Sequence, residues 1–189
     1  IIEGFHGSDP YLMSAHFLLG GARSGKSALA QRLAEESALP VTVIVTGEPR
    51  DAEMAERIAR HRRERPAHWR TVEAPFALAD ALRAHAAPGR FVLVDCLTLW
   101  LSNWLLACLD DTPRRGPEEF SAERAALLEL VAAPPGPLVL VANEVGLGLV
   151  PETALGRRFR DEAGRLNQYV AARAAAVSFV AAGLPLRLK

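Results

Sequence analysis

A phosphate-binding loop carries the most specific chemistry in this sequence. Residues 20–27 read GGARSGKS and fit the pattern G-x-x-x-x-G-K-[ST] at every fixed position. In such a loop, backbone N–H groups turn inward around a triphosphate, the lysine reaches the β- and γ-phosphates, and the hydroxyl binds Mg²⁺. Lys26 is therefore a candidate catalytic residue, and Ser27 is a candidate metal ligand. The predicted nucleotide-binding loop consists of Gly20, Gly21, Ala22, Arg23, Ser24, Gly25, Lys26 and Ser27.

The flanking sequence supports this interpretation. An apolar run at 16–19 predicts a strand before the loop, and the amphipathic spacing of 27–36 predicts a helix after it. A chance glycine-rich turn would lack this context. We therefore predict that the chain binds a nucleoside triphosphate.

A carboxylate ends another predicted strand. Residues 91–95 read FVLVD, an apolar run typical of a strand buried on both faces. The final residue, Asp95, matches the acidic residue that accompanies many phosphate-binding loops and positions Mg²⁺, usually through water. Asp95 and Ser27 are thus the predicted metal-binding residues. The alternative is that Asp95 only caps the helix that follows.

A histidine shares the apolar face of a helix predicted at 51–63. Met54, Ile58 and His61 lie at positions i, i+4 and i+7, which places them on one side. Spacing alone favours a buried structural histidine over a catalytic one. The segment at 64–70 then combines arginine, histidine and tryptophan, which suits a phosphate and a base but also fits a solvated basic loop.

Polar residues follow other predicted strands. Thr46 and Glu48 come after a β-branched run at 41–45, and Glu144 comes after an apolar run at 138–142. Because ligands bind beyond the carboxyl ends of strands in an open parallel sheet, these loops are predicted to line the crevice of the phosphate-binding loop. Ordinary turn residues are an equally good interpretation of Thr46 and Glu48.

The elements that must position these residues alternate along the chain. Apolar runs predict strands at 16–19, 41–45, 71–75, 91–95, 138–142 and 177–181, with the tail at 184–189 pairing at the sheet edge. Helical spacing predicts helices at 27–36, 51–63, 77–85, 97–109, 118–132 and 156–173. This pattern indicates an α/β fold with a mostly parallel sheet flanked by helices. Residues 13–189 are predicted to form a single domain, and residues 1–12 are interpreted as an expression remnant.

The composition limits the kinds of partner and the cellular location that we expect. Lysine plus arginine equals aspartate plus glutamate at 22 each, so no overall charge favours nucleic acid or an anionic membrane. No apolar stretch reaches the roughly 18 residues that a membrane span needs. Cys96 and Cys108 lack paired spacing, which predicts buried reduced thiols and a cytoplasmic protein. The apolar helix at 97–109, with Trp100 and Trp104, is predicted to be buried either in the core or against another subunit, and partial burial in a subunit interface is favoured.

Five blocks of sequence, taken together, carry a family resemblance. They are GGARSGKS, the helix residues from Glu53 to His61 that lead to Arg65-Pro66 and Trp69, VDCLTLWLSN at 94–103, NEVGLGLVPE at 143–152 and RFRDEAGRLNQ at 158–168. In this order they resemble the bifunctional adenosylcobinamide kinase and adenosylcobinamide-phosphate guanylyltransferase family of cobalamin biosynthesis. The resemblance covers residues 17–189, and it implies a RecA-like P-loop NTPase fold and a homo-oligomer, often a trimer.

The resemblance also implies roles for individual residues. In that family a histidine accepts GMP from GTP, and the matching position here is His61, preceded by Arg60 where some relatives carry a second histidine. It further implies a guanine nucleotide site. The residues implied for this site are Thr46, Gly47, Glu48, Glu64, Arg65, Pro66, Ala67, Glu73 and Asp95.

Two reactions on a corrinoid follow from the resemblance. With Mg²⁺, ATP or GTP would phosphorylate adenosylcobinamide; GTP would then guanylylate His61, which passes GMP to adenosylcobinamide phosphate and gives adenosylcobinamide-GDP and pyrophosphate. A simple small-molecule kinase is one alternative, because it needs Lys26 and Asp95 but no nucleophilic histidine. A non-catalytic nucleotide switch is another, and it would not depend on a corrinoid.

Overall fold

The computed structural model describes residues 14–63, 65–109 and 113–189, within which the strands form one sheet of seven in the order β3-β2-β4-β5-β1-β6-β7. All neighbours pair in parallel except β6 and β7, which are antiparallel. This confirms the predicted mostly parallel sheet and its edge strand near the C-terminus. The expression remnant predicted at 1–12 lies outside the described residues, and the single domain stays a prediction. The strands are β1 (Ala15–Gly20), β2 (Val41–Val45), β3 (Arg70–Glu73), β4 (Phe91–Asp95), β5 (Leu138–Asn143), β6 (Ala176–Ala181) and β7 (Leu184–Arg187).

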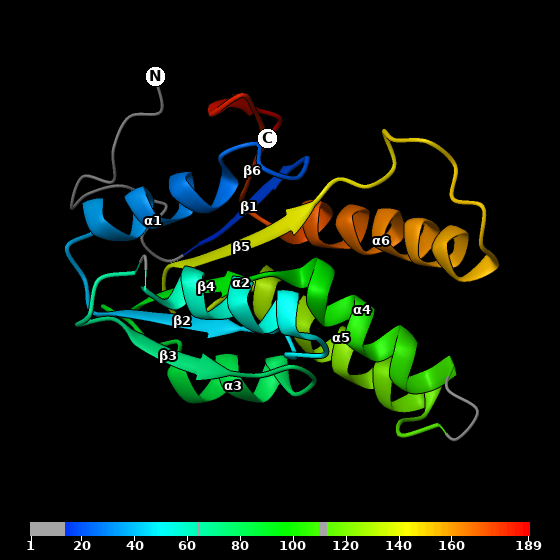
Figure 1. Cartoon of the computed structure of the whole chain (residues 1–189). Helices are drawn as coiled ribbons and strands as arrows, with labels where there is room; N and C mark the ends of the chain where they lie inside the picture. Colours follow the sequence, from blue (N-terminus) through cyan, green and yellow to red (C-terminus); the bar gives the residue numbers. More distant parts are fainter. Residues whose placement is uncertain (1–13, 64, 110–112) are drawn as a thin grey trace.

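Helices cover both faces of the sheet (Figure 1). Side chains of α3, α4, α5 and α6 pack in the larger buried cluster on one face, and α1 packs in a second cluster on the other. In the described part of the chain, no helix is long and apolar enough to cross a membrane. The helices are α1 (Lys26–Glu36), α2 (Ala52–Arg63), α3 (Leu78–His85), α4 (Leu97–Leu109), α5 (Pro117–Ala132) and α6 (Ala154–Arg173).

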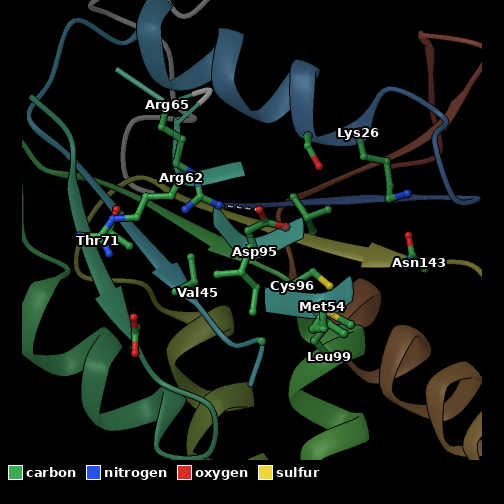
Figure 2. Close-up of a pocket in the computed structure, with 15 residues that line it drawn as sticks. Lys26, Val45, Met54, Arg62, Arg65, Thr71, Asp95, Cys96, Leu99 and Asn143 are labelled. Atoms are coloured by element: carbon green, nitrogen blue, oxygen red, sulfur yellow. Dashed lines mark hydrogen bonds and ion pairs between the residues drawn. The ribbon is translucent and has the colours of Figure 1, made fainter. Parts of the chain in front are cut away.

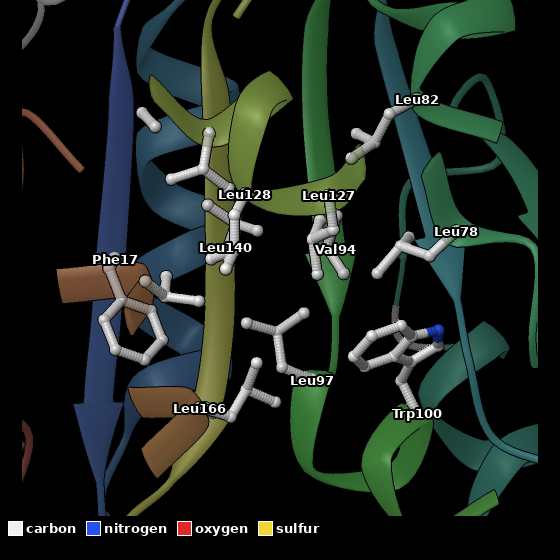
Figure 3. Packing of buried hydrophobic residues seen from close by; sticks show 14 of the residues in the cluster. Phe17, Leu78, Leu82, Val94, Leu97, Trp100, Leu127, Leu128, Leu140 and Leu166 are labelled. Atoms are coloured by element: carbon white, nitrogen blue, oxygen red, sulfur yellow. The ribbon is translucent and has the colours of Figure 1, made fainter. Parts of the chain in front are cut away.

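Burial on both faces explains why the central strands are apolar without alternation. Neighbouring residues of a strand point to opposite faces, so Phe17 enters the cluster under α3–α6 while Leu18 enters the cluster under α1. The same division holds in β4, where Val94 and Leu93 enter the two clusters. Figure 3 shows Phe17 and Val94 in the larger cluster with leucines from several helices.

The two tryptophans of α4 are buried by their own chain. Trp100 and Trp104 are 0% and 3% exposed within this single chain, where both rings lie against Phe120. Each indole N–H donates to the carbonyl oxygen of Phe76, at 2.9 and 3.3 Å. Side chains of α3 and α5 in the same chain therefore cover both tryptophans, as the core alternative predicted, and a subunit interface that involves α4 stays a prediction.

A buried histidine in β1 makes stability depend on pH. His16 Nε2 lies 2.9 Å from the hydroxyl of Ser178 on β6, and both residues are buried. Burial, with a smaller contribution from the positive charge of Arg187, lowers the pKa of His16 from 6.5 to about 4. The unfolded chain therefore binds a proton on His16 more tightly than the folded protein does. The contribution of His16 to the free energy of unfolding is fully present above pH 6.5 and is lost as the pH falls through 4.

We expect His16 alone to lower the free energy of unfolding by about 3 kcal/mol between pH 7 and pH 4, since each pKa unit corresponds to about 1.4 kcal/mol. Urea unfolding of the wild type and of His16→Gln at several pH values measures this. The glutamine retains a polar partner for Ser178 but does not titrate. Between pH 7 and pH 4, the free energy of unfolding of His16→Gln should therefore fall by about 3 kcal/mol less than that of the wild type. Parallel curves for the two proteins would contradict the assignment to His16.

Candidate active site

The carboxyl ends of the parallel strands β3, β2, β4, β5, β1 and β6 lie at one edge of the sheet. The register pairs Gly20 of β1 with Asn143 of β5, Asp95 of β4 with Val141 of β5, and Asp95 with Val45 of β2. Glu73 at the end of β3 pairs with Val45 from the other side. The predicted phosphate-binding loop and Asp95 therefore lie at the same edge, as the sequence indicated.

The phosphate-binding loop follows β1, and helix α1 begins at Lys26, inside the motif. The Lys26 ammonium donates to the carbonyl oxygen of Gly21 at 2.6 Å and to the hydroxyl of Ser24 at 3.4 Å. Two glycines are required by geometry. A side chain on Gly20 would collide with the Val180 carbonyl oxygen, and Gly25 has φ +99°, in the left-handed region that favours glycine.

The hairpin between β6 and β7 supports this loop from behind, a contact that the sequence did not reveal. Its two connecting residues, Ala182 and Gly183, both have positive φ, at 51° and 78°, as a tight two-residue turn requires. The N–H of Gly183 donates to the carbonyl oxygen of Ser24 at 2.8 Å. A β-carbon on Gly25 would lie only 2.9 Å from Gly183 Cα. The hairpin therefore holds the loop in place.

A pocket opens at this edge of the sheet, between the phosphate-binding loop, the strand ends and α2 (Figure 2). Among the predicted site residues it brings together Lys26, Ser27, Gly47, Arg65, Glu73 and Asp95. The other lining residues are Val45, Met54, Ile58, Arg62, Thr71, Cys96, Leu99, Val141 and Asn143.

Other predicted contacts do not line the pocket. Thr46 is 0% exposed, and its hydroxyl donates to the Cys96 carbonyl oxygen at 2.6 Å and accepts from the Cys96 N–H at 3.1 Å. Glu48 forms an ion pair with Arg50 at 2.7 Å. Pro66 and Ala67 are absent from the lining as well. Nucleotide contacts of these residues stay predictions, and Glu64 lies outside the described residues.

An ion pair joins the segment after α2 to the sheet. Arg65 Nη2 donates to Asp95 Oδ2 at 2.8 Å, and the two side chains are 6% and 19% exposed (Figure 2). Removing one partner of such a pair would leave the other charge poorly solvated. Arg65 therefore helps to orient the carboxylate that was predicted to position Mg²⁺.

Helix α2 contributes one face to the pocket. Met54, Ile58 and Arg62 follow one another at four-residue spacing and line it. A β-carbon on Gly47 would meet Ile58 Cδ1 at 3.4 Å and Leu99 Cδ1 at 3.3 Å, so the glycine permits this close approach. His61 belongs to the same helix, but its side chain lies outside what the structure describes.

Sequence reasoning did not name three polar residues of the lining as site residues, and these are Arg62, Thr71 and Asn143. Arg62 lies one helical turn after Ile58, so the spacing that grouped Met54 with Ile58 would have found it. Asn143 was visible as the polar end of an apolar strand. The register with Gly20 then places it beside the phosphate-binding loop.

The cysteine in the lining is not a nucleophile. Cys96 is buried, and burial, with a smaller contribution from the charge of Asp95, raises the pKa of its thiol to about 11. The thiol therefore stays protonated at neutral pH, and only the thiolate is reactive. The buried thiol confirms the expectation from sequence for Cys96, whereas Cys108 is only partly buried, so the expectation of burial is wrong there; both cysteines are free.

We expect Thr46→Val to lower the free energy of unfolding by about 1–3 kcal/mol, because two buried backbone groups of Cys96 lose their hydrogen-bond partner. Thr46→Ser keeps the hydroxyl and should recover most of this stability. Urea unfolding of the three proteins measures the effect, with nucleotide affinity determined in parallel. Unchanged stability with weakened nucleotide binding would show instead that Thr46 acts on the ligand.

Known proteins resemble this chain in sequence and in fold. A family model described as cobinamide kinase / cobinamide phosphate guanyltransferase matches residues 16–188. The bifunctional adenosylcobalamin biosynthesis protein CobP of Pseudomonas aeruginosa is 56% identical over 172 residues, which are 91% of this chain and 95% of that protein. The bifunctional adenosylcobalamin biosynthesis protein CobU of Escherichia coli is 42% identical over 179 residues, covering 90% and 97%.

A solved structure supports the fold. A prototypical ATPase from the type III secretion system of pathogenic bacteria matches with a TM-score of 0.53 and 12% sequence identity. The match covers 93% of this chain and 57% of that chain. With the sheet order and the phosphate-binding loop, this likeness confirms the predicted RecA-like P-loop NTPase fold.

Proposed function

The chain belongs to the cobinamide kinase / cobinamide phosphate guanyltransferase family, and we propose that both reactions of this bifunctional enzyme take place in the pocket at the strand ends. The first reaction phosphorylates adenosylcobinamide, and the second transfers GMP to the product in the biosynthesis of adenosylcobalamin. One observation carries the proposal. Lys26 and Asp95 line the same pocket as Ile58 and Arg62 of α2, the helix to which His61 belongs.

In the kinase reaction, the aminopropanol hydroxyl of adenosylcobinamide attacks the γ-phosphorus of ATP or GTP. Lys26 and the loop N–H groups stabilise the charge that spreads over the γ-phosphoryl oxygens. The corrinoid substrate follows from the family.

Mg²⁺ fits the residues at this edge. The Ser27 hydroxyl and the Asp95 carboxylate both line the pocket and offer the oxygen ligands that Mg²⁺ prefers. Among the described residues, no group of three or more His, Cys, Asp or Glu side chains could hold a metal by itself. Mg²⁺ would therefore take some of its ligands from the protein and the others from the triphosphate. There it would neutralise negative charge on the phosphoryl oxygens.

In the second reaction, neutral His61 attacks the α-phosphorus of GTP. A P–N bond forms, the bond between the α-phosphorus and the bridging oxygen breaks, and pyrophosphate leaves. The phosphate of adenosylcobinamide phosphate then attacks the same phosphorus and releases His61, giving adenosylcobinamide-GDP. The role of His61 rests on the family pattern, supported by the contribution of α2 to the pocket. The proposal also includes assembly into a homo-oligomer, with a trimer as the expected form, and a cytoplasmic location.

Incubation with Mg²⁺ and GTP labelled at the α-phosphate should leave label on the denatured wild-type protein that survives base and is lost in acid, as a phosphoramidate requires. His61→Ala should carry none. His68→Ala is the matched control, because His68 is exposed and outside the pocket lining, and it should label normally. Unlabelled wild-type protein that still phosphorylates adenosylcobinamide would instead support a simple kinase acting through Lys26 and Asp95.

The metal assignment makes a separate prediction. Asp95→Asn should raise the Mg²⁺ concentration for half-maximal kinase activity by about tenfold or more, since outer ligand partners change metal affinity by about 10- to 100-fold. Because this variant also disturbs the ion pair with Arg65, Arg65→Gln serves as the control: it breaks the same pair but keeps the carboxylate. Equal shifts in both variants would assign the effect to the ion pair and not to the metal.

A further inference from the structure

Asn143 occupies the position between the phosphate-binding loop and Asp95. Strand β5 runs between β1 and β4, and its last residue, Asn143, is the register partner of Gly20. Asp95 is the partner of Val141 on the other side of the same strand. In Figure 2, the labelled side chains of Lys26, Asp95 and Asn143 face the same pocket.

The backbone around Asn143 is fixed on several sides. Its N–H donates to the Thr98 hydroxyl at 2.7 Å, and its carbonyl oxygen accepts from Asn167 Nδ2 at 3.5 Å. The next residue, Glu144, donates its N–H to the carbonyl oxygen of Gly20 at 2.9 Å. The side chain of Asn143 is thus presented to the pocket from a fixed position.

The side-chain amide of Asn143 differs from the other two asparagine amides in the sequence. Asn103 Nδ2 donates to the carbonyl oxygens of Thr46 and Pro75, at 2.6 and 3.1 Å, and Asn167 Nδ2 donates to Asn143 as above. Within the described part of the chain, the half-buried amide of Asn143 makes no hydrogen bond and lines the pocket. An amide has a donor and an acceptor that seek partners, so this one is available to a ligand.

We infer that Asn143 is a catalytic residue of the phosphoryl-transfer reaction, where its amide binds the γ-phosphoryl group and the attacking hydroxyl. This inference rests on the proposed function and deepens it. Nδ2 donates to a γ-phosphoryl oxygen, and Oδ1 accepts from the hydroxyl of the acceptor alcohol. A bond forms between the hydroxyl oxygen and the γ-phosphorus, the bond from the γ-phosphorus to the bridging oxygen breaks, the nucleoside diphosphate leaves, and the hydroxyl proton is released to water.

The same contact has little influence on the second reaction. During guanylyl transfer the bonds change at the α-phosphorus, and the γ-phosphate departs unchanged within pyrophosphate. A hydrogen bond from Asn143 to the γ-phosphate would then be equally strong before and during the reaction, and such uniform binding does not accelerate it. Loss of the amide should therefore separate the two activities of one pocket.

The test is Asn143→Ala, assayed separately for phosphorylation of adenosylcobinamide and for single-turnover labelling of the protein by GTP. We expect kinase kcat to fall by about 100-fold, the size of effect seen when one preorganised donor is removed from a transition state. The KM for nucleotide should rise by a much smaller factor, because the hydrogen bond to the ground-state γ-phosphate is lost as well. The rate of protein labelling at saturating GTP should change little. The urea midpoint should stay the same, because the amide makes no hydrogen bond within the described residues.

Two further variants distinguish catalysis from positioning. Asn143→Asp keeps an acceptor, loses the donor and adds a negative charge beside the phosphates, so its kinase kcat should be no higher than that of Asn143→Ala. Asn167→Ala removes the amide that contacts the Asn143 carbonyl oxygen and keeps the Asn143 side chain, so its effect reports positioning alone, and its kinase activity should fall much less than that of Asn143→Ala.

Full kinase activity in Asn143→Ala would overturn the inference, and so would an equal loss of both reactions. A lowered urea midpoint in Asn143→Ala would also overturn it if Asn167→Ala lowers the midpoint by the same amount. A wild-type protein with neither reaction would overturn the proposed function itself, and the inference with it.

Discussion

The parallel pairing of β1, β5 and β4 is the constraint on which the site depends. Because these strands run in one direction, Gly20, Asn143 and Asp95 fall at the same edge, although they lie far apart in the sequence. A slip of one residue in any strand would turn its side chains to the opposite face. The two buried clusters prevent such a slip, since each strand must fill both. The apolar core thereby sets the geometry of the polar residues.

The opposite wall of the pocket is held much less firmly. Every described side chain of α2 is at least partly exposed, whereas α3, α4, α5 and α6 all bury apolar residues in the larger cluster. Ile58 contacts the region of Gly47 and Leu99, and the ion pair of Arg65 with Asp95 follows the helix. Since local opening is easiest where few apolar contacts are buried, α2 can shift at lower free-energy cost than the opposite layer. The pocket therefore combines a rigid sheet edge with an adjustable wall.

Local patterns predicted the elements well and their partners less well. Apolar runs and helical spacing located each strand and helix to within a few residues because both signals lie within short segments. Other contacts join segments that are distant in the sequence, so no local pattern predicts them. Examples are the hydrogen bond from the Thr46 hydroxyl to Cys96 and the contact of Gly183 with the phosphate-binding loop. Trp100 shows the same limit. An apolar side chain indicates burial, but the sequence does not say whether its own chain or a second copy covers it.

If both reactions take place in one pocket, as proposed, they also constrain the charge of the residues that line it. A triphosphate held by Lys26 would place its γ-phosphorus at the sheet edge and its α-phosphorus farther along, so the groups that act on the two bonds need different positions. At the sheet edge the carboxylates of Asp95 and Glu73 already line the pocket, and Arg65 forms an ion pair with Asp95. A further carboxylate in place of the Asn143 amide would repel a bound triphosphate, and this repulsion is strong where water is scarce. A neutral amide at Asn143 avoids this repulsion and still offers both a donor and an acceptor. The residue type at this strand end therefore suits phosphoryl transfer better than metal binding.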